Sequence, residues 1–108
     1  MLSKSYKISI SKDVKKKLEE QFDYIFYQQQ EPVLADKWII GIDKAISSLV
    51  HFPERCAIAP ENSLENKRLK TIVRHLIYKK SFRIIFIIIK NEVKILTVKH
   101  SAQKIIVH

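Results

Sequence analysis

The sequence contains almost no glycine and almost no cysteine: Gly41 and Cys56 are the only examples in 108 residues. P-loops and dinucleotide-binding loops need several closely spaced glycines, so both are excluded. One cysteine cannot form an internal disulfide bond. The four histidines lie too far apart in the sequence to match a metal-ligand motif. We therefore expect neither a metal site nor a bound cofactor.

Long hydrophobic runs are also missing. The longest, residues 84–89, has six residues, whereas a membrane-spanning helix needs about 20. The first residues, Met1-Leu2-Ser3-Lys4, lack the apolar stretch of a secretory signal. These absences predict a cytoplasmic protein that does not associate with membranes. The length and the 46% hydrophobic and 29% charged residues predict one globular domain over residues 1–108.

Charge is distributed unevenly along the chain. Residues 1–63 carry 9 Lys or Arg and 9 Asp or Glu, so this stretch is neutral. Residues 64–108 carry 11 Lys or Arg against Glu65 and Glu92, which accounts for the net charge of +9. Such asymmetry indicates that the second half binds a polyanion or an acidic partner. The alternative is a solvated surface that keeps the protein soluble.

The first half of the chain predicts a strand followed by two helices. Apolar and polar residues alternate over residues 6–10, as in a half-buried strand. Ser11 can then cap a helix over residues 11–29, which carries one apolar stripe. A second amphipathic helix begins near Pro32 and ends before Pro53. With so short a link, the two helices should form an antiparallel hairpin.

The second half predicts a β-meander after an irregular stretch over residues 53–66. Residues 72–78 form the first strand candidate, although their apolar residues could equally form a helical face. Residues 82–89 have little that is polar on either face and should form a central strand, and residues 93–99 form the third. We therefore expect an α+β fold of order β-α-α-β-β-β. Its antiparallel sheet should carry the helical hairpin on one face.

Cations and imidazoles dominate the groups that could carry chemistry in the basic half. They are Arg68, Lys70, Arg74, His75, Arg83, Lys99 and His100. Such groups can cleave RNA without a metal. Imidazole serves as acid or base near neutral pH, and arginine matches the geometry of phosphate oxygens. Arg74 and His75 should face opposite ways along their strand, so one of them at most lines a given site, and we favour Arg74.

Arg83 is the most informative of these residues because its strand is otherwise apolar. A charge in such a strand is costly unless it is paired or hydrated. Arg83 should share a face with Ile85 and Ile87, so we expect it near the start of the strand, where that face opens to solvent. The alternative role is a structural ion pair or an edge cation.

Four segments resemble the RelE/ParE toxin superfamily. Tyr78-Lys79-Lys80-Ser81-Phe82-Arg83-Ile84-Ile85-Phe86 looks like its "Tyr-Arg-Ile-hydrophobic-Phe/Tyr" strand. Residues 93–100 resemble the following strand, which typically ends in His or Arg. Residues 42–53 resemble the second helix with its closing proline, and residues 59–62 resemble a loop of plasmid-stabilisation proteins. The resemblance covers about residues 6–102 and implies a helical hairpin on a small antiparallel sheet.

The resemblance implies a toxin of a type II toxin–antitoxin module with one of two activities. RelE-like members are ribosome-dependent mRNA endonucleases, whereas ParE-like members inhibit DNA gyrase. Carried over by position, Arg74, Arg83 and His100 are the expected catalytic residues, and we expect Arg68, Lys70 and Lys99 to bind substrate. We slightly favour metal-independent mRNA cleavage. A non-catalytic nucleic-acid-binding module is a third possibility, although few aromatic residues on the sheet could stack on bases.

The C-terminal segment departs from the family pattern. Nucleases of the family often carry a Tyr or a His-Tyr pair there, whereas residues 102–108 offer His108 alone. The apolar residues 105–107 beside a basic sheet suggest that an acidic segment of a cognate antitoxin covers both. The expected partners are therefore this antitoxin and either the ribosome with its mRNA or DNA gyrase.

Overall fold

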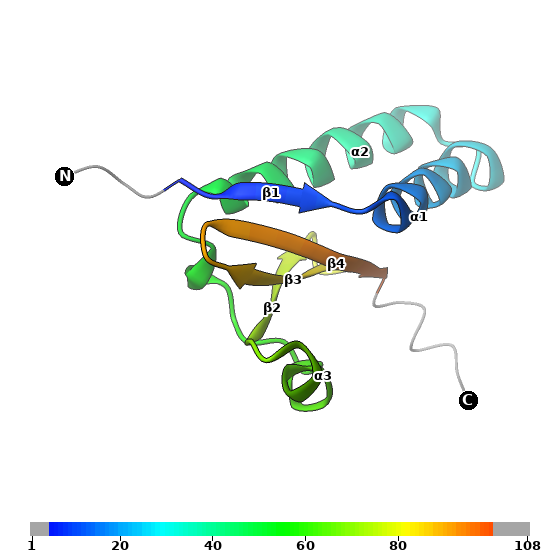
Figure 1. The fold of residues 1–108 in the computed structure, drawn as a ribbon. Coiled ribbons are helices and arrows are strands. Elements are labelled where there is room, and N and C mark those ends of the chain that lie inside the picture. The colour runs from blue at the N-terminus through cyan, green and yellow to red at the C-terminus, as the bar shows by residue number, and fades with distance from the viewer. Residues whose placement is uncertain (1–4, 101–108) are drawn as a thin grey trace.

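The structure, a computed structural model, describes residues 5–100, without the side chains of residues 64–66. Its elements, shown in Figure 1, are β1 (Lys7–Ile10), α1 (Lys12–Asp23), α2 (Pro32–Ser47), α3 (Asn62–Leu69), β2 (Val73–Tyr78), β3 (Phe82–Ile89) and β4 (Glu92–His100). Short helical turns over Tyr24–Gln28, Ser48–Val50 and Pro53–Arg55 join some of them. This is the predicted α+β order with one additional helix.

The predicted helical hairpin is formed by α1 and α2. Ser11 caps α1 as expected, because its Oγ accepts a hydrogen bond from the backbone N–H of Val14 at 3.2 Å. The helix changes at Tyr24 into a π-helical turn that ends at Gln28. Pro32 begins α2, where its missing N–H leaves no intrahelical bond unmade.

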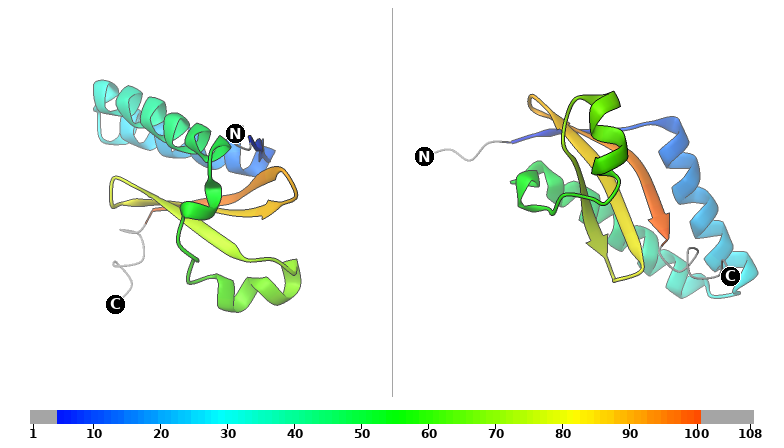
Figure 2. Two further views of the ribbon diagram at one scale, coloured as in Figure 1. Left: turned by 90° about the vertical axis from the view of Figure 1, so that its left-hand side faces the viewer. Right: turned by 90° about the horizontal axis from the view of Figure 1, so that it is seen from below.

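The third helix lies partly within a stretch that was predicted to be irregular. α3 covers the face of the sheet that lies away from the hairpin (Figure 2). Its residues show almost no apolar periodicity, so the sequence pattern gave no helical signal. Its first residue is held by a polar contact instead: the Asn62 side chain accepts a hydrogen bond from the Val73 N–H at 2.8 Å.

The four strands form one open sheet in the order β1-β4-β3-β2. β2, β3 and β4 make the predicted antiparallel meander, and β3 lies inside the sheet as predicted. β1 runs parallel to β4, so the prediction of a wholly antiparallel sheet is wrong for this strand. The helices and the meander separate β1 from β4 in sequence, and strands that no tight hairpin joins can run in the same direction.

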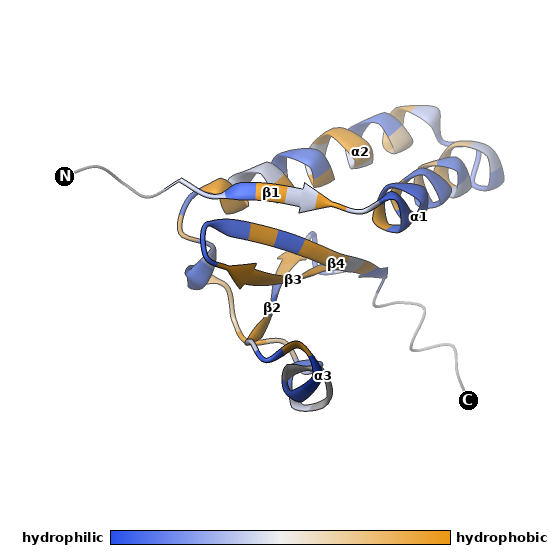
Figure 3. Cartoon of the chain, in the orientation of Figure 1, coloured by the Kyte–Doolittle hydropathy of each residue, from blue (hydrophilic) through white to orange (hydrophobic). Residues whose placement is uncertain are grey.

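The two faces of the sheet carry apolar clusters of different size. The larger cluster lies under the hairpin and joins Phe86 and Ile84 of β3 to Trp38 and Ile42 of α2. The smaller one lies on the α3 side and contains Ala59, Val73, Ile85 and Ile87. Figure 3 shows the corresponding alternation of hydrophilic and hydrophobic residues along β4. Both faces of the sheet therefore carry an apolar cluster, and the larger one lies under the hairpin.

The single glycine serves packing rather than a turn. A Cβ atom at Gly41 would clash with the phenol group of Tyr78, so the glycine leaves room for that side chain against α2. Left-handed backbone positions are occupied by other residues, including Lys79, Lys80 and Lys90 in the hairpin turns.

Candidate functional site

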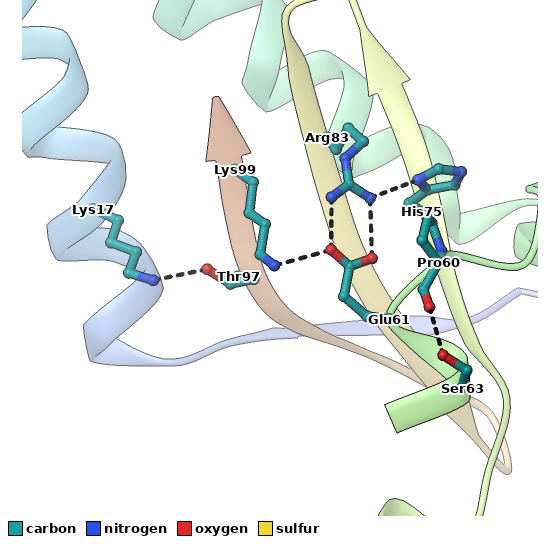
Figure 4. A network of polar contacts seen from close by, with 8 residues as sticks. All are labelled: Lys17, Pro60, Glu61, Ser63, His75, Arg83, Thr97 and Lys99. Carbon is teal, nitrogen blue, oxygen red and sulfur yellow. Dashed lines mark hydrogen bonds and ion pairs between the residues drawn. The ribbon is translucent and has the colours of Figure 1, made fainter. Parts of the chain in front are cut away.

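Arg83 forms a two-point ion pair with Glu61 on the α3 side of the sheet. Its Nη1 donates to Glu61 Oε1 at 3.0 Å, and its Nη2 donates to Oε2 at 2.6 Å. Lys99 donates to the same Oε2 at 2.9 Å (Figure 4). The side chains of Arg83 and Glu61 are only 11% and 16% exposed. The pair is therefore largely removed from water. A structural ion pair of this kind was the alternative role predicted for Arg83.

His75 completes a group of four side chains, called here the polar cluster: Glu61, His75, Arg83 and Lys99. The His75 Nδ1 lies 3.0 Å from Arg83 Nη1 (Figure 4). Because a guanidinium group can only donate, His75 Nδ1 is the acceptor and its proton lies on Nε2. Burial, then the charge of Arg83, lowers the pKa of His75, while Glu61 opposes them. The imidazole is therefore neutral at neutral pH.

The carboxyl group of Glu61 is held in its ionised form. The hydrogen bond from Arg83 holds its pKa far below the usual range. Burial works against this shift, and Lys99 adds to it. The same hydrogen bond raises the pKa of Arg83. Around neutral pH the polar cluster therefore consists of one carboxylate, two cations and a neutral imidazole.

Strand register explains why these residues meet. Arg83 lies opposite Lys99 on β4 and opposite Ile77 on β2. His75 is two residues from Ile77 and therefore points to the same face, since side chains alternate along a strand. Glu61 reaches this face from the segment just before α3. The sequence pattern did not point to Glu61, and it favoured Arg74 over His75. The one available signal was the loop around Pro60 and Glu61 in the family resemblance.

The three residues predicted to be catalytic are not brought together. Arg83 belongs to the polar cluster, whereas Arg74 and His100 pair with Phe86 and Phe82, which belong to the hairpin-side cluster. The Arg74 Nη1 donates to the backbone carbonyls of Cys56 at 2.8 Å and Glu54 at 3.3 Å. The expectation that Arg74 rather than His75 lies with Arg83 is therefore corrected. The catalytic roles of Arg74 and His100 stay predictions.

The residues predicted to bind substrate also separate. Lys99 joins the polar cluster. Arg68 lies in the last turn of α3, and Lys70 follows it in a left-handed backbone conformation. The C-terminal residues with which an antitoxin was expected to interact, 101–108, lie outside the described residues.

Among the side chains that the structure describes, in residues 5–63 and 67–100, no three His, Cys, Asp or Glu residues gather as the ligands of a metal ion would. No helix in that range combines the length and the apolar composition that a membrane-crossing segment requires.

Comparison with known proteins decides the family. Residues 8–105 match the family model described as "ParE toxin of type II toxin-antitoxin system, parDE". The chain belongs to this family. It is therefore a toxin of a type II toxin–antitoxin system, and the predicted membership of the RelE/ParE superfamily is confirmed.

A solved structure agrees in fold. The chain is similar to the structure titled "Chromosomal ParDE TA system from P. aeruginosa", with a TM-score of 0.68 and 19% identity. The match covers 91% of this chain and 98% of that one. No curated protein matches the sequence.

Proposed function

We propose that this toxin cleaves mRNA on the ribosome without a metal ion, and that the polar cluster is its active site. The observation that supports this proposal is the meeting of Glu61, Arg83 and Lys99 within hydrogen-bond distance on one face of the sheet. Metal-independent RNA cleavage needs a base for the 2′-hydroxyl, cations for the charge that develops on the phosphate, and an acid for the leaving oxygen. These three side chains offer each of those groups.

In the proposed reaction, the Glu61 carboxylate takes the proton of the 2′-hydroxyl, and the 2′ oxygen attacks the adjacent phosphorus atom. Arg83 and Lys99 stabilise the negative charge on the phosphoryl oxygens. The bond to the 5′ oxygen then breaks, and the Lys99 ammonium group gives that oxygen a proton. The products are a 2′,3′-cyclic phosphate and a 5′-hydroxyl. Water returns a proton to Lys99 and removes one from Glu61. The Nε2–H of His75 can donate a hydrogen bond to a phosphoryl oxygen.

The ion pair within the cluster supports dependence on the ribosome. A phosphate can bind Arg83 only if it replaces part of the contact between Arg83 and Glu61, which opposes binding of free RNA. A ribosome that holds mRNA in a fixed position would supply the missing binding free energy. Free RNA should therefore be cut slowly, and ribosome-bound RNA quickly.

The same ion pair supports a second candidate, inhibition of DNA gyrase without catalysis. A carboxylate whose pKa lies far below the usual range is a weak base. Arg83 is also already satisfied by Glu61, as a residue with a purely structural role would be. A toxin that acts by covering its target needs neither a base nor a free cation.

We also propose that a cognate antitoxin with an acidic segment neutralises the toxin. Support comes from the family description, from the net charge of +9, and from the position of Lys99, which is 39% exposed beside the polar cluster. An acidic segment laid over that face would cover the site and offset its charge. Coexpression of the adjacent reading frame, followed by co-purification, tests this interaction.

Primer extension on a reporter transcript, run beside a plasmid supercoiling assay with purified gyrase, tests the main proposal. We expect cuts within the reading frame in cells that express the toxin. Glu61→Gln should reduce cutting by about 10²–10⁴-fold, whereas Glu19→Gln, the same change on an exposed part of α1, should leave it unchanged. Intact transcript together with inhibited supercoiling would exclude the nuclease in favour of gyrase inhibition.

A further inference from the structure

A hollow lies between α1 and the C-terminal half of β4, and its volume is about 730 Å³. Gln21 of α1 and His100 of β4 line it, together with Trp38 and Phe82. We call this hollow the α1–β4 groove. Lys99 lines the groove as well and also binds Glu61 with its ammonium group. The groove lies on the hairpin side of the sheet and the polar cluster on the α3 side, and Lys99, in the part of β4 that β1 does not cover, belongs to both.

Three rings form a continuous series in the groove. Trp38 lies against Phe82 with ring centroids 5.2 Å apart and a tilt of 57°. Phe82 and His100 are stacked at 4.3 Å, with their planes 8° apart. Trp38 is only 5% exposed, and its Nε1 has no hydrogen-bond partner among the described residues. His100 ends the series and is partly exposed, so a further flat ring could extend the stack from it.

The groove is lined by two lysines, Lys17 and Lys99, and by one carboxylate, Glu20, and it follows an open strand edge. β1 pairs with β4 only as far as Ile95, so residues 96–100 have no strand partner on that side within the described part of the chain. Lys17 reaches across this edge and donates to the Thr97 Oγ1 at 2.8 Å (Figure 4). Lys17 and Lys99 therefore place two ammonium groups where a chain of phosphates could pass from the groove to the polar cluster.

We propose that the α1–β4 groove binds one unpaired base of the RNA, next to the phosphate that is cut. The proposal rests on the proposed nuclease function. The groove offers one feature for each part of a nucleotide. The aromatic stack suits the face of a base, the amide of Gln21 suits the polar edge of the base, and the two cations at the rim suit a phosphate. An acidic protein segment would use the cations, but its carboxylates would offer no flat ring to continue the stack from His100. This role makes His100 a binding residue rather than a proton carrier.

Trp38 is the only tryptophan of the chain and lines the groove, so its fluorescence reports on occupancy. The probe is a 2′-O-methyl RNA hexanucleotide, which cannot be cut, compared with six versions that each lack one base. We expect the intact hexanucleotide to change Trp38 emission. Loss of one particular base should weaken binding about 10-fold, a typical effect of one stacked base. His100→Ala should weaken binding of the intact probe similarly, and His51→Ala, at an exposed histidine elsewhere, should not.

Kinetics on ribosome-bound transcript then separate the two proposals. We expect His100→Ala to raise KM about 10-fold and to leave kcat and its pH profile unchanged. A fall in kcat at constant KM would overturn the groove as a base site and make His100 catalytic. Equal binding of all six base-deleted probes would also overturn the base site. So would a change in Trp38 emission on addition of an acidic peptide but not of RNA. In each of these cases cleavage by the unaltered toxin would persist, whereas absence of all cleavage would refute the proposed function itself.

Discussion

The two faces of the sheet differ in what occupies the space between sheet and helix. Under the α1–α2 hairpin, apolar side chains from both layers form the larger cluster, and Phe86, Ile84 and Ile42 are fully buried there. On the α3 side, the apolar cluster is small, and an ionised group of side chains lies beside it. The comparison indicates that the hairpin face supplies most of the stability, while the α3 face can hold costly charges in fixed positions.

The largest expected effect tests the hairpin face. Phe86 has no exposed surface, so Phe86→Ala should lower the free energy of unfolding by about 3–5 kcal/mol through lost burial and an unfilled cavity. Ile77, which is 56% exposed on the opposite face of β2, is the control. Ile77→Ala should change stability by no more than about 0.5 kcal/mol. Chemical denaturation measures both, and similar losses would show that the two faces contribute equally.

The next effect tests whether the polar cluster acts as a unit. Arg83→Met removes the guanidinium group and leaves Glu61 with Lys99 alone, which should cost about 2 kcal/mol. Glu61→Ala leaves two cations without their carboxylate and should cost a similar amount. Either change alone already breaks the ion pair. The loss in free energy of unfolding of the double variant should therefore be about 1–2 kcal/mol smaller than the sum of the two single losses. Additive losses in a denaturation series would contradict the cluster as a coupled unit.

These two faces also differ in how well the sequence predicts them. Apolar periodicity identified both helices of the hairpin and the central strand, because burial in a layered core imposes a regular spacing. It could not identify α3, whose residues show almost no such spacing. Nor could it give the direction of β1, because periodicity does not say which strand will lie beside it.

The candidate site was predicted only in part for a related reason. Arg83 stands out as a charge in an apolar strand, and that signal led to a real ion pair. Its partner Glu61 lies 22 residues earlier in a segment without a pattern, so only the folded chain shows their contact. Arg74 and His100 were chosen by residue type and family position. Neither criterion reveals that both residues lie on the face opposite to Arg83.

A third prediction uses pH to compare the ionised cluster with the rest of the chain. The pKa of Glu61 is lower in the folded state than the value of about 4.3 in the unfolded chain. Its contribution to stability is therefore present above that value and is lost as the pH falls below it. The pKa of His75 is also lower in the folded state than in the unfolded chain. Below about pH 6.5 the unfolded state therefore binds more protons than the folded state, and the free energy of unfolding falls.

Urea denaturation from pH 8 to pH 3 measures these two steps. Stability should decrease in acid, first near the histidine range and then more steeply near the carboxylate range. His75→Asn should remove the first decrease and Glu61→Gln should reduce the second. His51→Asn, at an exposed histidine, should leave both in place. An unchanged profile in the Glu61→Gln protein would mean that the ion pair contributes nothing to the acid sensitivity.

The smallest expected effect concerns Arg74, a cation on the hairpin face of β2. Its guanidinium group holds the segment before Ile58 through the carbonyls of Cys56 and Glu54. That segment pairs with β2, since the His75 N–H donates to the Ala57 carbonyl at 3.1 Å.

Arg74→Ala should therefore cost about 1 kcal/mol, the net value of a lost hydrogen bond. It should also speed hydrogen exchange at the amides of residues 57–59 and 75, while exchange in the hairpin stays slow. Transcript cutting should persist, because the Arg74 side chain lies on the face of the sheet opposite to Arg83 and Glu61, and Arg74→Lys should restore part of the lost stability. If cutting fell 100-fold while exchange in the segment stayed the same, Arg74 would be a catalytic residue, as its position in the sequence suggested, and the two faces would have to share the site.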